Sequence, residues 1–219
     1  MTWFEPIDTL DLIMKGIIIG VVASAPMGPV GILCIQRTLN KGRWYGFITG
    51  IGAAFSDIIY AMVTGVGMSY VMDFIENKTN MFYLQLAGSV MLFIFGLYTW
   101  RTNPAESLRP VSKDKGTLVY NLVTAFGVTF SNPLIVFLFV ALFARFTFVI
   151  PEHPFQQSVG YLSIFLGALL WWFALAYAIN KVRTSFEVSR IRVFNRIIGS
   201  VVMVASVAGI IMTLMGLSL

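Results

Sequence analysis

Cysteine and histidine are nearly absent from this chain of 219 residues, which has one of each, Cys34 and His153. A single cysteine cannot form an internal disulfide or a dithiol redox pair. The single histidine lies in a loop between two prolines, and a metal site needs several such ligands together. These scarcities exclude a disulfide scaffold, and no metal or other cofactor is expected.

Charged residues are also scarce, at 11% of the chain, whereas hydrophobic residues make up 58%. Because soluble domains usually carry about a quarter charged residues, this composition indicates an integral membrane protein. The length suits one compact bundle, so we expect a single transmembrane domain over residues 1–219. Glu5, Asp8 and Asp11 precede the first apolar run. Acidic residues there are the wrong charge for a signal peptide, so the first run is expected to be a retained span.

Six apolar segments each come close to the roughly 20 residues that are needed to cross a bilayer. They cover about residues 12–36, 44–71, 81–100, 117–146, 156–180 and 194–217. The predicted fold class is an all-α integral membrane protein with six transmembrane helices. The longest link, 101–116, contains two prolines and mixed charges, which is typical of a solvated loop.

Basic residues indicate the orientation of these segments. Twelve of the fifteen Lys and Arg residues lie in or beside the first, third and fifth links. By the positive-inside rule these links, including 101–116, are cytoplasmic, and both termini face outward. We expect a multi-pass protein of a bacterial-type cytoplasmic membrane, surrounded by lipid. Binding of nucleic acid is not expected, because the basic residues are divided among membrane-adjacent loops.

Prolines interrupt two of the segments. The first segment contains Ala25-Pro26-Met27-Gly28-Pro29, and the fourth contains Phe130-Ser131-Asn132-Pro133-Leu134. Proline removes a backbone donor and clashes with the preceding turn, so we predict that helices 1 and 4 are broken or kinked at mid-membrane. Lipid tolerates such breaks only where protein or a water-filled cavity satisfies the freed backbone groups. The candidate substrate-binding residues at these breaks are Pro26, Met27, Gly28, Pro29, Ser131, Asn132 and Pro133.

The matching breaks also predict an internal repeat, with repeat 1 at about 12–100 and repeat 2 at about 117–217. The sequence around Gly88 in the third segment has a counterpart around Gly199 in the sixth. Because three is odd, two units of three helices insert in opposite directions, as in the inverted repeats of many secondary transporters. The small-residue face from Gly88 to Gly96 would allow a homodimer, but it would serve internal packing equally well.

Asp57 lies near the middle of the second segment and is the only ionisable residue that we expect deep in a span. Ionisable residues at such depth are costly, usually face a cavity or a partner, and usually have a function. Gly46, Gly50, Ala53 and Ala61 share its helical face, which favours close packing against another helix. We interpret Asp57 as a proton- or ion-coupling residue and Gly50 as a substrate-binding residue. The alternative is a neutral Asp57 that only hydrogen-bonds between helices.

The fifth segment has a comparable face. An aromatic side chain at Trp171 or its neighbour corresponds in position to Asp57 of the second segment, and it would either wall a substrate cavity or fill the core. The residues of this face, at helical spacing, are Gly160, Ser163, Gly167, Trp171, Ala174 and Ala178.

A small zwitterion fits this set of groups. A half-helix that begins after a break presents unpaired N–H groups and a positive dipole end to a carboxylate, and Asp57 offers the opposite charge to an ammonium group. Enzyme chemistry is not expected: an aspartyl protease needs two carboxylates at one site, and a nucleophilic triad needs a histidine within reach. The alternatives are a small-ion exporter and a membrane structural or assembly protein that transports nothing.

The same residues resemble the signature of the LysE-type amino-acid exporter family. The resemblance lies in Ala25-Pro26-Met27-Gly28-Pro29, then Arg37, Gly42-Arg43, Gly46, Gly50 and Asp57, then Asn132-Pro133 and Asn195-Arg196-Ile197-Ile198-Gly199. It covers nearly the whole chain and implies a six-span exporter of amino acids or related solutes, driven by a proton or ion gradient. Met27 stands between Pro26 and Gly28, where the commoner family form has a direct Pro-Gly-Pro. This departure is typical of a divergent branch.

Overall fold

The computed structural model describes residues 9–70, 78–102, 116–132, 134–149, 153–182 and 189–216. These residues form eight α-helices and no strand, which confirms the all-α prediction. The helices are α1 (Thr9–Ser24), α2 (Pro29–Lys41), α3 (Arg43–Ser69), α5 (Lys78–Arg101), α6 (Leu118–Phe130), α7 (Leu134–Phe146), α8 (Pro154–Lys181) and α9 (Ser189–Leu214). Most of the expected loop 101–116 lies outside the described residues.

The helices are of two kinds. α3, α5, α8 and α9 are each long and apolar enough to cross a membrane alone. α1 and α2 meet this condition only as a pair, as do α6 and α7, and the two pairs are bent by 80° and 73°. The described residues therefore provide four to six membrane spans, six if each bent pair is one span. Both bends fall at the predicted breaks.

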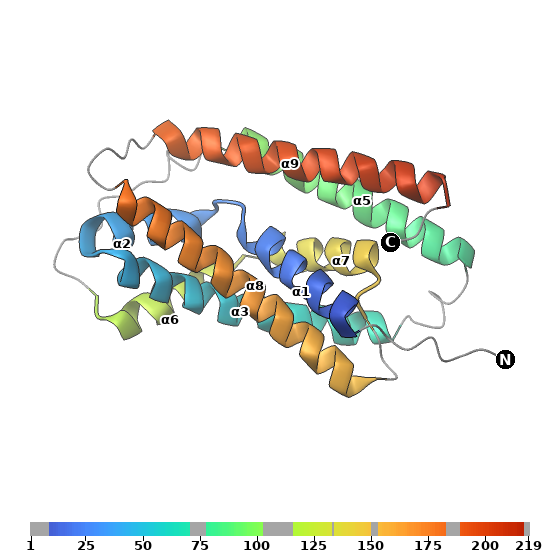
Figure 1. Ribbon diagram of the computed structural model, residues 1–219, viewed down its shortest axis with the longest axis horizontal. Coiled ribbons are helices and arrows are strands. Elements are labelled where there is room, and N and C mark those ends of the chain that lie inside the picture. The colour runs from blue at the N-terminus through green and yellow to red at the C-terminus, as the bar shows by residue number, and fades with distance from the viewer. Residues whose placement is uncertain are drawn as a thin grey trace.

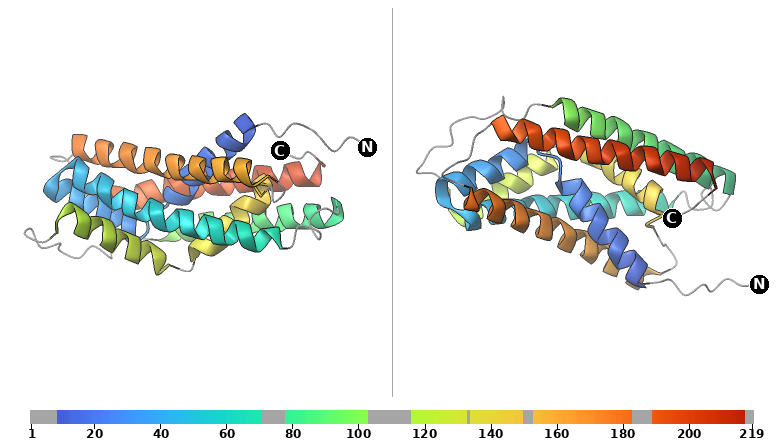
Figure 2. Two further views of the ribbon diagram at one scale, coloured as in Figure 1. Left: turned by 90° about the horizontal axis from the view of Figure 1, so that it is seen from below. Right: turned by 45° about the horizontal axis from the view of Figure 1, so that its top comes forward.

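α5 and α9 run side by side and form a layer of their own over the other helices (Figures 1 and 2). In the body beneath this layer, α1 packs along α8 and α6 packs along α3. α7 packs against α5 at one end of the bundle, and α2 lies at the opposite end (Figure 1). At the α2 end lie the ends of α2, α5 and α8, whose last turns each carry a basic residue.

Small residues let the helices approach closely, as the face of α3 predicts. Gly46, Gly50, Ala53 and Ala61 are buried together with Asp57. The same principle holds elsewhere in the body, because close approach of two backbones leaves no room for a Cβ atom. Glycines of α1 and α8 pack against each other's helices, and Gly52 of α3 packs against the backbone of α6.

The predicted face of α8 is only partly right. Gly160, Ser163 and Gly167 are buried, but Ala174 and Ala178 are exposed. The buried stripe instead continues through the side chains of Trp172, Leu175, Ala176 and Ile179. The contacts of α8 with α1 lie in its first half, around Gly160 and Gly167, whereas α8 contacts α3 in both halves, at Tyr161 and at Trp172. The buried stripe shifts where α8 runs beyond α1.

Two arginines near helix ends are buried in addition to Asp57. Arg37 is 6% exposed and Arg145 is 5% exposed. α2 extends beyond the predicted end of the first segment, so Arg37 lies between helices rather than in a loop. Its guanidinium donates to Thr49 Oγ1 at 3.0 Å, the Asn121 carbonyl oxygen at 2.8 Å and Thr124 Oγ1 at 2.7 Å. These hydrogen bonds join α2 to α3 and α6.

The small-residue face of α5 packs within the chain. A Cβ atom at Gly88 would lie 2.9 Å from the carbonyl oxygen of Ala141 in α7. At Gly96 it would lie 3.0 Å from the carbonyl oxygen of Gly199 in α9. Both contacts are intramolecular, so this face does not offer the free surface that a homodimer at the same glycines would need.

Candidate functional site

The first break is an unwound link between α1 and α2. The helix α1 ends at Ser24, and Pro29 is the first residue of α2, a position where its missing N–H costs nothing. Gly28 is the N-cap residue, and because glycine has no side chain, the start of α2 has no side-chain cap. The first hydrogen bond of α2 runs from the Ile32 N–H to the Gly28 carbonyl oxygen at 3.2 Å. The N–H groups of the preceding turn therefore remain available to a ligand.

The second break separates α6 from α7, and here a side chain caps the new helix. Asn132 Oδ1 accepts from the Leu134 N–H at 3.2 Å, and the Asn132 carbonyl oxygen accepts from the Ile135 N–H at 3.3 Å. At the end of α6, Tyr60 Oη donates to the carbonyl oxygen of Phe130 at 2.5 Å. The two breaks thus differ: the N-terminus of α7 is capped by Asn132, whereas that of α2 has no side-chain cap.

Asp57 lies beside these breaks in the middle of α3. It is 6% exposed, and Ser24 Oγ at the end of α1 donates to Asp57 Oδ2 at 3.4 Å. This long hydrogen bond is the interaction that connects the carboxyl group to the first break. The buried small-residue face of α3 turns Asp57 toward the interior, as predicted.

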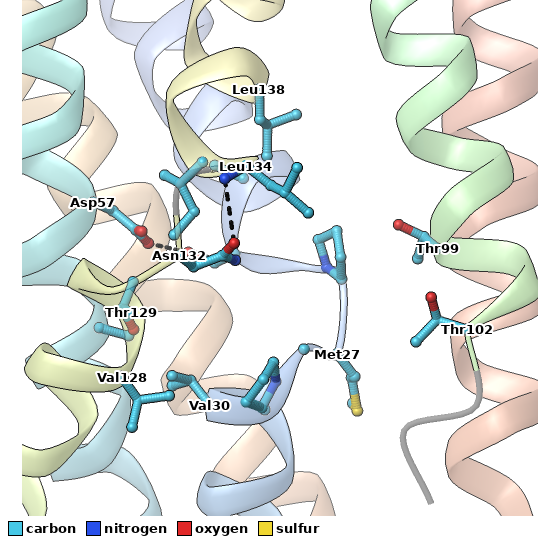
Figure 3. A pocket seen from close by; sticks show the side chains of 18 of the residues that line it. Met27, Val30, Asp57, Thr99, Thr102, Val128, Thr129, Asn132, Leu134 and Leu138 are labelled. Carbon is cyan, nitrogen blue, oxygen red and sulfur yellow. Dashed lines mark hydrogen bonds between the residues drawn. The ribbon is translucent and has the colours of Figure 1, made fainter. Parts of the chain in front are cut away.

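A cavity of about 460 Å³ lies between the two breaks, a volume within the range of small-molecule sites. Asp57 and Asn132 face it from one side, and Thr99 of α5 and Thr102, just beyond the end of α5, face it from the other (Figure 3). Among the described residues that line it, Asp57 is the one acidic side chain, and none is basic. The predicted residues that line the cavity are Pro26, Met27, Gly28, Pro29, Asp57, Ser131 and Asn132.

Three predicted residues are not found in the lining. Pro133 lies outside the described residues. Gly50 lies behind the wall, where its missing side chain makes room for Trp172, and it is the indole of Trp172 that lines the cavity. Trp171 instead packs near Phe194 of α9, with 6.0 Å between ring centroids. Of the two positions that the prediction allowed, Trp171 and its neighbour, the cavity is lined by the neighbour, Trp172, because α8 turns a different face to α3 than a uniform helical repeat suggests.

The structure adds polar residues that the sequence-based prediction did not select. Thr129 is 6% exposed, lines the cavity and has no hydrogen-bond partner for its Oγ1. The Nε1 of Trp172 is likewise buried and without a partner. Native proteins leave few buried polar groups unpaired, so two at one cavity suggest a ligand or water. The position of Thr129, one turn before Asn132, was the available sequence signal.

These features define a multi-pass membrane protein with two discontinuous helices around a central cavity, an architecture typical of secondary transporters. The chain belongs to the LysE type translocator family, whose family model matches residues 21–219. Members of this family are transporters and not enzymes.

Two relatives cover most of the chain. The "Putative amino acid efflux protein YcgF" of Bacillus subtilis (strain 168) is 27% identical over 194 residues, which is 87% of this chain and 90% of that protein. The "Uncharacterized membrane protein YahN" of Escherichia coli (strain K12) is 23% identical over 172 residues, which is 77% of this chain and 75% of that protein. No solved structure gives a significant match.

Proposed function

We propose that this protein is a secondary active exporter of amino acids or related small zwitterions, coupled to the proton gradient by Asp57. The observation that carries the proposal is the cavity in which an uncapped helix N-terminus and one carboxyl group face the same space. A relative that is named as a putative amino acid efflux protein supports the choice of substrate.

The substrate carboxylate would bind at the N-terminus of α2. Val30 and Gly31 line the cavity and belong to the first turn of α2, where N–H groups lack partners within the helix. The positive end of the helix dipole adds to this preference for an anion. The corresponding N–H group of Leu134 in α7 already binds Asn132, so α7 is the poorer anion site. Thr129 would donate its unpaired hydroxyl to the same substrate.

The substrate ammonium group and a proton would compete for Asp57. A carboxyl group that binds either one in turn exchanges a proton for a substrate molecule, which is the basis of antiport. Because the described lining has one acid and no base, neutral amino acids match its charge better than acidic or basic ones.

Alternating access requires that the cavity open to one side at a time. The cavity reaches Tyr98, Thr99 and Thr102 in and just beyond the last turn of α5, toward the end of the bundle with the basic links. At the other end, α5 packs against α7 through Gly88, above a cluster of buried aromatic rings that includes Phe143. By the positive-inside rule this end is cytoplasmic and both termini are outside, so a state that opens at this end would load substrate for export.

An inverted repeat would explain how the opposite state forms. α1 packs along α8 while α6 packs along α3, and these are equivalent pairs if repeat 1 is α1–α5 and repeat 2 is α6–α9. The third helices, α5 and α9, pair with each other. Rocking of this pair against the body would then close one end and open the other.

Transport by purified protein in proteoliposomes tests the proposal. An acidic lumen should drive accumulation of labelled neutral amino acids as protons leave. Asp57→Asn should remove the accumulation driven by the pH gradient, whereas Asp11→Asn, an acid on α1 that pairs with Lys15 at 2.7 Å, should not change it.

Three outcomes would count against the proposal. Unchanged proton-driven accumulation in Asp57→Asn would remove the coupling role of this residue. Flux of an inorganic ion with which no amino acid competes would identify a small-ion exporter. No flux of any solute would favour a membrane protein with a structural role.

A further inference from the structure

A buried asparagine of α9 holds the unwound link between α1 and α2. Asn195 is 1% exposed and lines the cavity. Its Oδ1 accepts from the Met27 N–H at 3.0 Å, and its Nδ2 donates to the Met27 carbonyl oxygen at 3.3 Å. One side-chain amide therefore satisfies both backbone polar groups of a single residue that is 168 positions away in sequence.

These two hydrogen bonds matter because Met27 has no helical partners for its backbone. An unwound segment within a membrane protein is stable only if each freed N–H and C=O finds a partner. The side chain of Asn195 can do this because an amide both donates and accepts. Met27 itself is 3% exposed, so water does not replace these bonds in the structure.

The position of Met27 connects this contact to substrate binding. Met27 immediately precedes Gly28, the N-cap residue of α2, so the orientation of the link determines where the first N–H groups of α2 point. α9 in turn packs along α5, whose last turn forms the opposite wall of the cavity. Asn195 thus joins the pair α5 and α9 to the N-terminus of α2, which would bind the substrate carboxylate.

We propose that Asn195 is a positioning residue for the substrate site: through Met27, it holds the N-terminus of α2 against the cavity. This inference rests on the proposed function for its effect on transport. It assigns to α9 a direct influence on the affinity for substrate, in addition to any part in the movement of the helix pair.

Asn195→Asp distinguishes positioning from general folding support. The new carboxyl group has the same shape, and it accepts from the Met27 N–H in either protonation state. It donates to the Met27 carbonyl oxygen only when it is protonated. Both hydrogen bonds are therefore present at low pH, and at high pH a carboxylate faces a carbonyl oxygen. Loss of one hydrogen bond plus this repulsion should raise the KM for substrate by about tenfold.

Other titratable groups lie nearby and must be separated from this effect. Asp57 of α3 and Tyr98 of α5 line the same cavity. Arg192 and Arg196 flank Asn195 on α9, and the guanidinium of Arg196 lies 5.3 Å from the ring centroid of Trp100. The measured quantity is therefore the ratio of the variant's KM to that of the unaltered protein at each pH, which cancels the titration that both share.

Transport in proteoliposomes between about pH 5 and 8.5 is the first test. For Asn195→Asp we expect a KM ratio near one at the acidic end that rises to about ten at the alkaline end. Asn195→Leu should show a raised KM at every pH. Asn180→Asp, which makes the same change on α8 outside the cavity lining, should give a flat ratio. A flat ratio for Asn195→Asp, or an unaltered KM in Asn195→Leu, would overturn the proposal.

Hydrogen–deuterium exchange of the Met27 amide is the second test and does not depend on transport. At one pH, the exchange should be at least about tenfold faster in Asn195→Leu than in the unaltered protein, because the acceptor Oδ1 is gone. It should stay slow in Asn195→Asp. Unchanged exchange in Asn195→Leu would refute the hydrogen bonding of Asn195 to Met27 itself. If instead exchange behaves as expected but the unaltered protein transports no amino acid, the proposed function is wrong, whereas the role of Asn195 in holding Met27 is supported.

Discussion

Thr129→Val is the most informative single substitution, because stability and transport should change in opposite directions. The hydroxyl of Thr129 is buried, lines the cavity and has no hydrogen-bond partner. A buried hydroxyl without a partner costs about 1–3 kcal/mol, and valine has nearly the same shape without it. We therefore expect the unfolding free energy of the substrate-free protein to rise by about 1 kcal/mol.

Substrate binding should weaken in the same variant. A hydrogen bond from this hydroxyl to a substrate carboxylate would contribute about 1.5–3 kcal/mol, as bonds to charged groups do. Because each 1.4 kcal/mol is about a factor of ten in affinity, the KM should rise by roughly ten- to a hundredfold. The maximal rate should change less, since the cavity keeps its shape.

Thr64→Val is the matched control for this experiment. Thr64 of α3 is 5% exposed and also has an unpaired Oγ1, but it is not part of the cavity lining. Thermal unfolding in detergent should show a similar gain in stability for both variants, and proteoliposome transport should show a raised KM only for Thr129→Val. Equal and unaltered KM values would refute the assignment of Thr129 to the substrate site. A loss of stability in Thr129→Val alone would mean that its hydroxyl already has a partner.

Two further substitutions test the packing that positions the site. Gly20→Ala places a Cβ atom against the backbone carbonyl of Ile164, so α1 and α8 must separate. Thermal unfolding should show that the free energy of unfolding falls by about 2 kcal/mol. Gly67→Ala, with open space around it, should show no loss of stability. Equal stability of these two variants would contradict the close approach of α1 and α8. Arg37→Lys keeps the buried charge but loses the planar guanidinium that donates to three acceptors on α3 and α6. We expect it to lower the free energy of unfolding by about 2 kcal/mol. The exposed Arg43→Lys should be neutral, and an equally small effect at Arg37 would show that its hydrogen bonds contribute little.

The breaks in the helices could be predicted because proline acts locally. A proline within an apolar run disturbs its own turn whatever surrounds it, so the links around Met27 and Asn132 follow from the sequence. The burial of Asp57 is likewise local, since small residues at helical spacing mark the face of α3 that packs inward.

The choice between Trp171 and Trp172 could not be made in the same way. A uniform helical repeat favours Trp171, but α8 runs beyond α1 while it stays packed on α3, and its buried stripe shifts there. Arg37 lies just beyond the predicted first segment, which ends at about residue 36, whereas α2 continues to Lys41. Its acceptors on α3 and α6 become visible only when those helices are in place.

The sequence by itself determined the helical membrane class, the two interruptions and the acid that faces inward, because each depends on chemistry within a few residues of chain. Tertiary structure alone decided which groups share the cavity: the unpaired hydroxyl of Thr129, the indole of Trp172 and the amide of Asn195 on Met27. The physical reason is that these contacts join segments far apart in sequence. Their partners are set by how whole helices pack and not by local propensity.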